Sequence, residues 1–145
     1  MSPMSLLLFY AKDDCFAIDT HSILKVVPFA KLGKASFQKK GVIGLLNFGG
    51  KSIPVIDFNV FLDKSPSTQF LSTRIILLVN KEEENNFLGI VGENVFDLIT
   101  VAKDDFIPSV SKVSYPFIEK SFIFNGQTVQ YLDIPSFFHL FEEEQ

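Results

Sequence analysis

The 145-residue chain has little of what many functional sites require. It contains one cysteine, one arginine, two histidines and no tryptophan. A single cysteine, Cys15, excludes an intramolecular disulfide, and His21 and His139 have no further cysteine or histidine at ligand spacing, which argues against a zinc site. Arginine is the usual bidentate donor to phosphate and guanine. Because Arg74 is the single arginine of the chain, the sequence argues against nucleic-acid recognition.

Long apolar runs and an excess of positive charge are also absent from the sequence. No stretch approaches the ~20 apolar residues of a membrane span. The apolar run over residues 6–11 follows no positive charge and is too short for a signal peptide. The formal net charge is −4 and the pI is about 5.1, which disfavours electrostatic binding to nucleic acid or anionic lipid. We therefore expect a cytoplasmic protein with no nucleic-acid partner and no membrane insertion.

Hydrophobic residues are abundant by contrast. They make up 47% of the chain and include 17 phenylalanines, enough for a large core. A chain of this length buries roughly 68 to 70% of its unfolded surface. We expect a single domain that folds without disulfides or metal.

A repeat organises the sequence. Residues 48–61 read FGGKSIPVIDFNVF and residues 124–137 read FNGQTVQYLDIPSF. The two segments align without a gap at an offset of 76 residues, and they share Phe, Gly, Asp and Phe at equivalent positions. An offset of about half the chain predicts two similar lobes rather than a solenoid, which needs at least about three repeats.

Each copy of the repeat encodes a hairpin followed by a short helix. Gly49-Gly50 and the equivalent Asn-Gly pair tolerate the positive φ of a type I′ turn, which suits a two-residue hairpin. Asp57 and Asp133 then stand at helix N-cap positions, where a carboxylate accepts hydrogen bonds from free backbone N–H groups. We interpret these two aspartates as caps rather than as a catalytic carboxylate pair.

Short strands with turn signals between them predict an all-β fold of small barrels. The Ser-, Thr- and Pro-rich residues 63–73 predict the boundary between a first lobe of about residues 1–66 and a second of about 67–145, although an exchange of terminal strands between the lobes stays open. Because proline cannot donate to a ladder, Pro54 places its strand at a sheet edge or with this position turned away from the partner strand. The predicted strands are 5–11, 15–19, 23–29, 42–48, 52–56, 74–80, 87–91 and 94–101, with a hairpin before residue 133 and a long connection over 102–120.

Several segments resemble the CheW-like domain, an adaptor that couples chemoreceptors to a histidine kinase. The family's central motif, approximately G-V-x-N-L-R-G-x-x-x-P-V-x-D-L, is similar to residues 44–50 followed by 54–58. Weaker likenesses cover residues 9–18, 89–95 and 131–133. The resemblance implies two SH3-like five-stranded β-barrel lobes and a non-catalytic role without cofactor or metal. It also implies two partners, the regulatory domain of a CheA-like histidine kinase and the cytoplasmic tip of a methyl-accepting chemoreceptor.

The same resemblance implies a partner-binding surface with altered charge. Gly49 stands where the family usually carries Arg, and Lys25 stands where it usually carries Glu. Loss of a guanidinium and reversal of a charge predict weaker or altered binding to standard receptors. Two alternatives stay open: a specialised paralogue with another output, such as surface motility, or a sensor that binds a small molecule between the lobes. The candidate partner-binding residues are Ile23, Lys25, Val26, Asn47, Gly49, Gly50 and Pro54.

The remaining chemical groups favour structural interpretations. Cys15 lies in a predicted strand without a basic partner, so we expect a small buried side chain rather than a nucleophile. The spacing of the last helix places His139 on its exposed face, and His21 lies in a predicted bend. The edge at Pro54 and Gly49-Gly50 either docks another chain or is blunted and binds nothing. We expect no catalytic residues.

Overall fold

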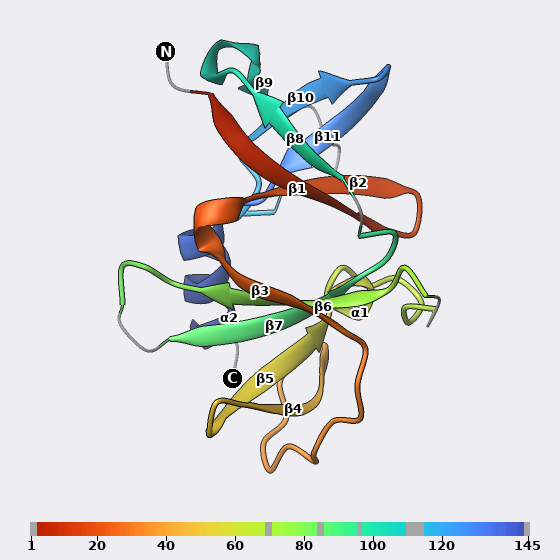
Figure 1. Cartoon of the computed structure of the whole chain (residues 1–145), viewed down its shortest axis with the longest axis vertical. Coiled ribbons are helices and arrows are strands. Elements are labelled where there is room, and N and C mark those ends of the chain that lie inside the picture. Colours follow the sequence, from red (N-terminus) through yellow and green to blue (C-terminus); the bar gives the residue numbers. More distant parts are fainter. Residues whose placement is uncertain (1–2, 69–70, 84–85, 96, 110–114, 144–145) are drawn as a thin grey trace.

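Two packed sheets and two helices make up the computed structural model, which describes residues 3–143 except 69–70, 84–85, 96 and 110–114 (Figure 1). The strands are β1 Met4–Ala11, β2 Asp14–Asp19, β3 Ile23–Pro28, β4 Val42–Phe48, β5 Lys51–Asp57, β6 Arg74–Val79, β7 Phe87–Gly92, β8 Leu98–Val101, β9 Ile107–Pro108, β10 Lys120–Phe124 and β11 Gln127–Tyr131. The helices are α1 Phe58–Phe61 and α2 Ile134–Glu143, and the 3-10 turns are η1 Thr20–Ser22 and η2 Lys103–Asp105. This arrangement confirms the expected all-β fold.

The strands do not divide between the sheets at residue 66. Sheet A has the order β8-β1-β2-β11-β10-β9, and sheet B has the order β3-β6-β7-β5-β4. Sheet A therefore takes its strands from both ends of the chain, whereas sheet B takes its strands from the middle. The sheets differ from lobes that are contiguous in sequence, because β1 and β2 pair with strands of the second half, and β6 and β7 pair with strands of the first. An exchange of terminal strands was the alternative left open above. Sheet A also has six strands instead of the expected five, since the short β9 adds to its edge.

The exchange of strands is reciprocal. In each sheet an antiparallel hairpin, β1-β2 or β6-β7, pairs on one side with an antiparallel strand, β8 or β3. On the other side it pairs in parallel with the outgoing strand of a repeat hairpin, β11 or β5. Each half of the chain thus gives its first hairpin to one sheet and its second hairpin to the other. As a result, the two copies of the sequence repeat lie in different sheets, β4-β5 in sheet B and β10-β11 in sheet A.

Both repeat hairpins turn at the expected residues. Gly49 and Gly50 have φ of 58° and 81°, and Asn125 and Gly126 have φ of 51° and 75°. All four lie in the left-handed region, which a type I′ turn requires at both central positions. The aspartate that follows each outgoing strand accepts from the backbone of the next helix: Asp57 from the N–H of Asn59 at 3.0 Å, and Asp133 from the N–H of Ser136 at 3.2 Å.

Two expectations about strands need correction. Of the two placements expected for Pro54, the sheet edge is wrong, because β5 lies between β4 and β7 and the edge is β4. Pro54 faces Leu45 in the β4 register, and the parallel pairing with β7 begins one residue later, at Val55, so the missing N–H interrupts no recorded pair with β7. The strand expected over 94–101 spans only Leu98–Val101. It is preceded by an isolated bridge between Tyr10 and Glu93.

The core between the sheets is aromatic. Phe9 and Phe16 of sheet A are at most 1% exposed, and they meet Phe58 of α1 at ring-centroid distances of 5.3 and 5.1 Å. Phe117 and Phe137 complete the cluster at 6.3 and 6.0 Å from Phe58. Rings from α1, α2 and both halves of the chain therefore fill the space where the sheets meet. The largest buried cluster is thus shared by the two sheets, and each sheet has a smaller buried cluster of its own.

Candidate protein-binding surface

Strand β3 is an edge strand with an exposed middle. Its sequence, ILKVVP, is rich in branched residues, which suit an extended half-buried strand. Leu24 and Val26 are 46% and 37% exposed, and Lys25 between them is exposed as well. The pairing with β6 shifts register between Ile23 and Lys25, a bulge of the kind that bends an edge. Three consecutive side chains thus face solvent beside an unpaired backbone edge.

The tip of the central hairpin lies close to β3. The Lys25 ammonium stands 6.0 Å from the ring centroid of Phe48, the last residue of β4. Asn47, Gly49 and Gly50 flank that ring in sequence and are exposed. The structure therefore brings the expected binding residues of β3 and of the hairpin tip into one region of sheet B.

Ile23 and Pro54 lie apart from this region. Ile23 is half-buried and packs against the core between the sheets. Pro54 is half-buried and lines a groove of about 400 Å³ between β5, β7 and α2, together with Phe138 and Phe141. Neither residue belongs to the exposed region around Lys25 and the hairpin tip. Among the expected binding residues, only the other five share the exposed face.

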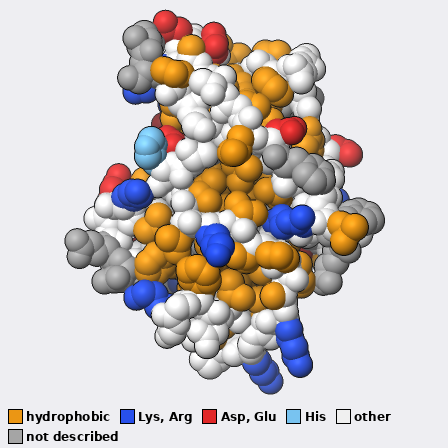
Figure 2. Space-filling view, in the orientation of Figure 1, with side chains coloured by type: hydrophobic (Ala, Val, Ile, Leu, Met, Phe, Trp, Pro, Cys, Tyr) orange, Lys and Arg blue, Asp and Glu red, His pale blue; other side chains and the backbone are white. Residues whose placement is uncertain are grey.

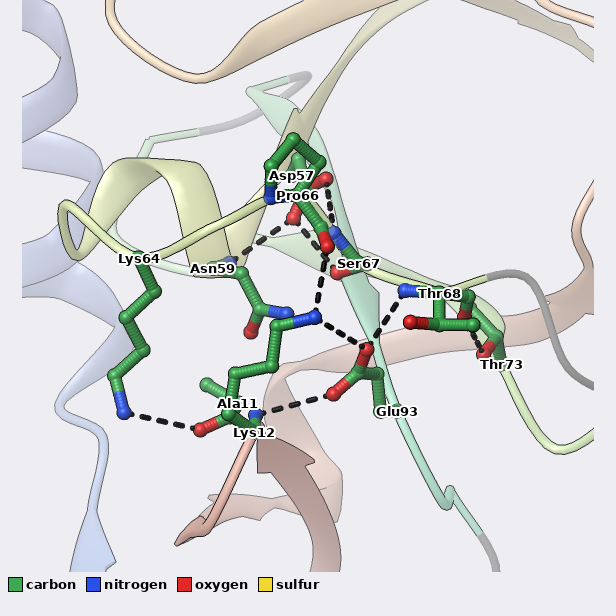
Figure 3. A network of polar contacts seen from close by, with 10 residues as sticks. All are labelled: Ala11, Lys12, Asp57, Asn59, Lys64, Pro66, Ser67, Thr68, Thr73 and Glu93. Carbon is green, nitrogen blue, oxygen red and sulfur yellow. Dashed lines mark hydrogen bonds and ion pairs between the residues drawn. The ribbon is translucent and has the colours of Figure 1, made fainter.

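A polar network holds the segment after α1 against both sheets (Figure 3). Glu93, only 7% exposed, accepts hydrogen bonds from the backbone N–H of Lys12 at 3.1 Å and of Thr68 at 2.8 Å. The Lys12 ammonium lies 3.5 Å from the same carboxylate and donates to the carbonyl of Pro66 at 2.8 Å. The turn between β1 and β2, the end of β7 and the segment at 66–68 are joined at this carboxylate.

Asp57 extends the network on the other side of that segment. Its carboxylate accepts from the backbone N–H and hydroxyl of Ser67 at 2.9 and 2.7 Å, besides capping α1. Asp57 is 5% exposed, so the hydrogen bonds compensate for burial of its charge. The cap interpretation was correct for the helix, but the same carboxylate also anchors the connection between the halves of the chain.

The network sets the ionisation of Glu93. Burial alone raises the pKa of this carboxyl, whereas the hydrogen bonds from Thr68 and Lys12 and the charge of Lys12 lower it. The opposing effects leave the pKa of Glu93 below its ordinary value. The group is therefore a stable anion at neutral pH, which suits an anchor rather than a proton donor.

The remaining titratable and nucleophilic groups lie in structural settings. Cys15 is 2% exposed within the core of sheet A, and burial raises the pKa of its thiol. Burial and the charges of Asp19 and Asp133 raise the pKa of Tyr131 to about 12. His21 is exposed with its ring 3.1 Å from Asp19, and His139 lies on the exposed face of α2. Within the described part of the chain, no three His, Cys, Asp or Glu side chains gather as a metal site would require.

Sequence reasoning missed most members of the polar network. Lys12 lies between the predicted strands 5–11 and 15–19, and Ser67 and Thr68 lie in the predicted boundary at 63–73, for which no contacts were expected. Lys12 has φ of 56°, which is uncommon for a non-glycine residue and is compensated here by its bonds to Glu93. The one available signal for the network was Glu93, which directly follows the apolar run of β7. A charge that is buried beside such a run requires polar partners.

Helices of the described chain are too short or too polar to cross a membrane.

Comparisons with known proteins identify a family and a similar fold. A model of the CheW-like domain matches residues 5–142. The chain is also similar in structure to the scaffolding protein TtCheW from Thermoanaerobacter tengcongensis, with a TM-score of 0.80 and 19% identity over 91% of this chain and 85% of that one. A search of curated proteins found no match. Because the family match spans nearly the whole sequence, the chain belongs to the CheW-like domain family.

Proposed function

We propose that this chain is a non-catalytic adaptor in chemotaxis-type signal transduction, which couples chemoreceptors to a CheA-like histidine kinase. The observation that supports this most is the family match over residues 5–142, together with a fold similar to that of a scaffolding protein. The buried carboxylates Asp57 and Glu93 act as anchors, and Asp57 also caps α1, which suits a structural role. In this proposal the protein works by holding other proteins together.

The proposed partners are the regulatory domain of the kinase and the cytoplasmic tip of a methyl-accepting receptor. The exposed middle of β3 and the hairpin tip are the proposed contact residues, with Ile23 and Pro54 supporting them. Each contact can be small, of order 800 Å² per partner or less, because many such contacts in an array add avidity without new chemistry. The aromatic packing between the sheets makes a rigid support for such contacts.

Binding to standard receptors is altered in this proposal. Lys25 presents an ammonium where the family usually presents a carboxylate, and Gly49 presents no side chain where the family usually presents a guanidinium. A partner surface that fits the usual charges would meet a like charge at one position and lack a donor at the other. We therefore expect weak binding to an ordinary receptor tip.

Restoring the usual residues tests this directly. We expect the double variant Lys25→Glu/Gly49→Arg to bind an ordinary receptor tip about tenfold more tightly than the natural sequence, as a close charge pair allows. Gly49 has φ of 58° and no heavy atom within 4 Å of an added Cβ, so the Cβ of the arginine meets no clash and the substitution costs about 1–2 kcal/mol of backbone strain. Isothermal titration measures both proteins against the same tip. Unchanged affinity would show that these positions do not control receptor binding.

A further inference from the structure

Charge is distributed unevenly along the chain. Residues 20–56 contain six lysines and no aspartate or glutamate, which gives this segment a formal charge of +6. The rest of the chain has seven basic and seventeen acidic residues, and hence a formal charge of −10. Since the segment forms β3, β4 and β5, the positive charge is concentrated on sheet B. Figure 2 shows this separation on one face, with most Lys and Arg side chains over the lower part and most Asp and Glu above.

Most of these lysines are not neutralised within the molecule. Lys40 pairs with Asp63 at 2.8 Å, and Lys39 donates to the carbonyl of Phe141 at 3.0 Å. Ion pairs with carboxylates are absent among the described residues for the other four, which are Lys25, Lys31, Lys34 and Lys51. Unpaired lysines grouped on one lobe produce a positive potential that attracts acidic groups.

Apolar side chains lie among the unpaired lysines. Leu24 and Val26 flank Lys25 on β3. After β3 ends, Lys31 lines a groove of about 410 Å³. Ile43, 44% exposed at the start of β4, lines the same groove as Lys31. We call these five residues the basic apolar face. It combines an unpaired strand edge, a groove lined mainly by apolar residues with Asp57 and Ser67 at its wall, and two ammonium groups without a carboxylate partner.

The composition of this face favours an acidic protein over other anionic partners. Its cations are all lysines, without the guanidinium that reads phosphate and bases bidentately. An anionic bilayer would also meet the −10 charge of the remaining chain. Two copies of the chain repel each other through their net charge of −4. A strand edge beside apolar side chains, in contrast, is suited to main-chain and side-chain contacts with another protein.

We propose that the basic apolar face binds an acidic amphipathic segment of a partner protein. Apolar side chains of the partner pack on Leu24, Val26 and the groove at Ile43. Carboxylates of the partner face Lys25 and Lys31. This inference rests on the proposed adaptor function and identifies the chemistry of the partner that the adaptor selects.

Binding of charge-altered receptor tips tests the inference. The probes are an ordinary chemoreceptor-tip hairpin and a variant in which its exposed Lys and Arg residues are replaced by Glu. We expect the natural chain to bind the Glu-substituted tip about tenfold more tightly than the ordinary tip at low salt, with the preference falling as salt rises. Lys25→Glu should reduce binding of the substituted tip about tenfold. The matched control Lys103→Glu changes an exposed lysine of η2 by the same charge and should change that affinity by less than about twofold.

Three results would overturn the inference. One is equal loss of affinity in Lys25→Glu and Lys103→Glu, which would indicate non-specific attraction. Another is self-association of the natural chain in sedimentation velocity that Lys25→Glu abolishes, which would identify a second copy as the occupant. The third is flotation with phosphatidylglycerol-containing vesicles that Lys25→Glu abolishes, which would identify a membrane surface. Melting curves of both variants confirm that each is folded.

Failure of the proposed adaptor function gives a different result from failure of this inference. If the chain binds a kinase regulatory domain but shows no preference for the acidic tip, the inference is wrong and the adaptor function stands. If it binds neither the kinase domain nor either tip, the adaptor function is wrong, and the inference falls with it.

Discussion

Single buried carboxylates determine how the halves of this chain are joined. Glu93 and Asp57 hold the segment at 66–68 by accepting hydrogen bonds from its backbone and from Ser67. Each carboxylate is less than 10% exposed, so its charge is stable only while these donors stay in place. The connection between the halves is therefore a fixed part of the structure rather than a loose linker.

Replacing Glu93 tests this anchor. Glu93→Gln turns an amide toward backbone N–H groups and leaves at least one of them unpaired, which costs about 1–3 kcal/mol of unfolding free energy. Urea denaturation at pH 7 measures the loss. Glu119→Gln, at an exposed position, is the control and should change stability by less than about 0.5 kcal/mol. Equal stability of the two variants would show that the network is not an anchor.

The pH dependence of this difference follows from the pKa of Glu93. Because the folded pKa lies below its ordinary value of about 4.3, the ionised group stabilises the fold fully above that pH. The contribution is lost as pH falls through the folded pKa. We expect the stability gap between the natural chain and Glu93→Gln to be constant from pH 6 to pH 7 and to shrink below about pH 4. A gap that widened on acidification would contradict the assigned sign.

At the scale of elements, the packing of β7 on β1 depends on a glycine. A Cβ added at Gly92 would lie 2.7 Å from Cδ2 of Phe9, whose ring is fully buried between the sheets. Close approach of the two strands is thus possible only without a side chain at this position. The hairpins β1-β2 and β6-β7, which the halves exchange, meet at this contact.

We expect Gly92→Ala to destabilise the protein by about 1–3 kcal/mol, since the buried ring cannot move without disturbing the core. Gly33→Ala is a matched control, because its Cβ would meet only the carbonyl of Leu45 at an ordinary 3.6 Å. Both variants lower the entropy of the unfolded chain equally, so their difference isolates the clash. Thermal melting measures it, and indistinguishable melting temperatures would contradict the close packing.

Local signals predicted the elements, whereas the assembly of the elements required long-range information. The dipeptides at 49–50 and 125–126 and the caps Asp57 and Asp133 depend only on neighbouring residues, and the structure has them where they were expected. The reciprocal exchange of hairpins could not be predicted, because each pairing joins strands far apart in sequence with similar patterns. The choice between an edge and an interior strand at Pro54 stayed open for the same reason, since nothing local shows that β7 pairs with this strand.

At the scale of the whole molecule, the exchange makes the two sheets interdependent. Each sheet contains strands from both halves of the chain, and the phenylalanine cluster around Phe58 belongs to neither sheet alone. Unfolding of one sheet would expose the cluster of buried side chains that both sheets cover. A rigid two-lobed support for partner proteins follows from this interdependence.

Phe58→Ala tests the shared core. Removing a fully buried ring that contacts aromatic residues of both helices should cost about 3–5 kcal/mol. Far-UV and near-UV circular dichroism should still report one coincident transition, because both sheets lose the same core. Phe106→Ala, at a half-buried position packed on sheet A, should cost less. Two separate transitions in the natural chain would show that the sheets fold independently.

Assembly with partners tests the central claim most directly. The measurement is sedimentation velocity of the purified chain mixed with a kinase regulatory domain and a receptor tip that together form a ternary complex with an ordinary member of the family. The account predicts that the chain forms a complex with the kinase domain. It also predicts a ternary complex with the ordinary tip that is less stable than the complex of the ordinary member. The variant Lys25→Glu/Gly49→Arg should form this ternary complex more tightly than the natural chain. Sedimentation of this chain and the double variant as free protein in every mixture would contradict the claim that the molecule is an adaptor.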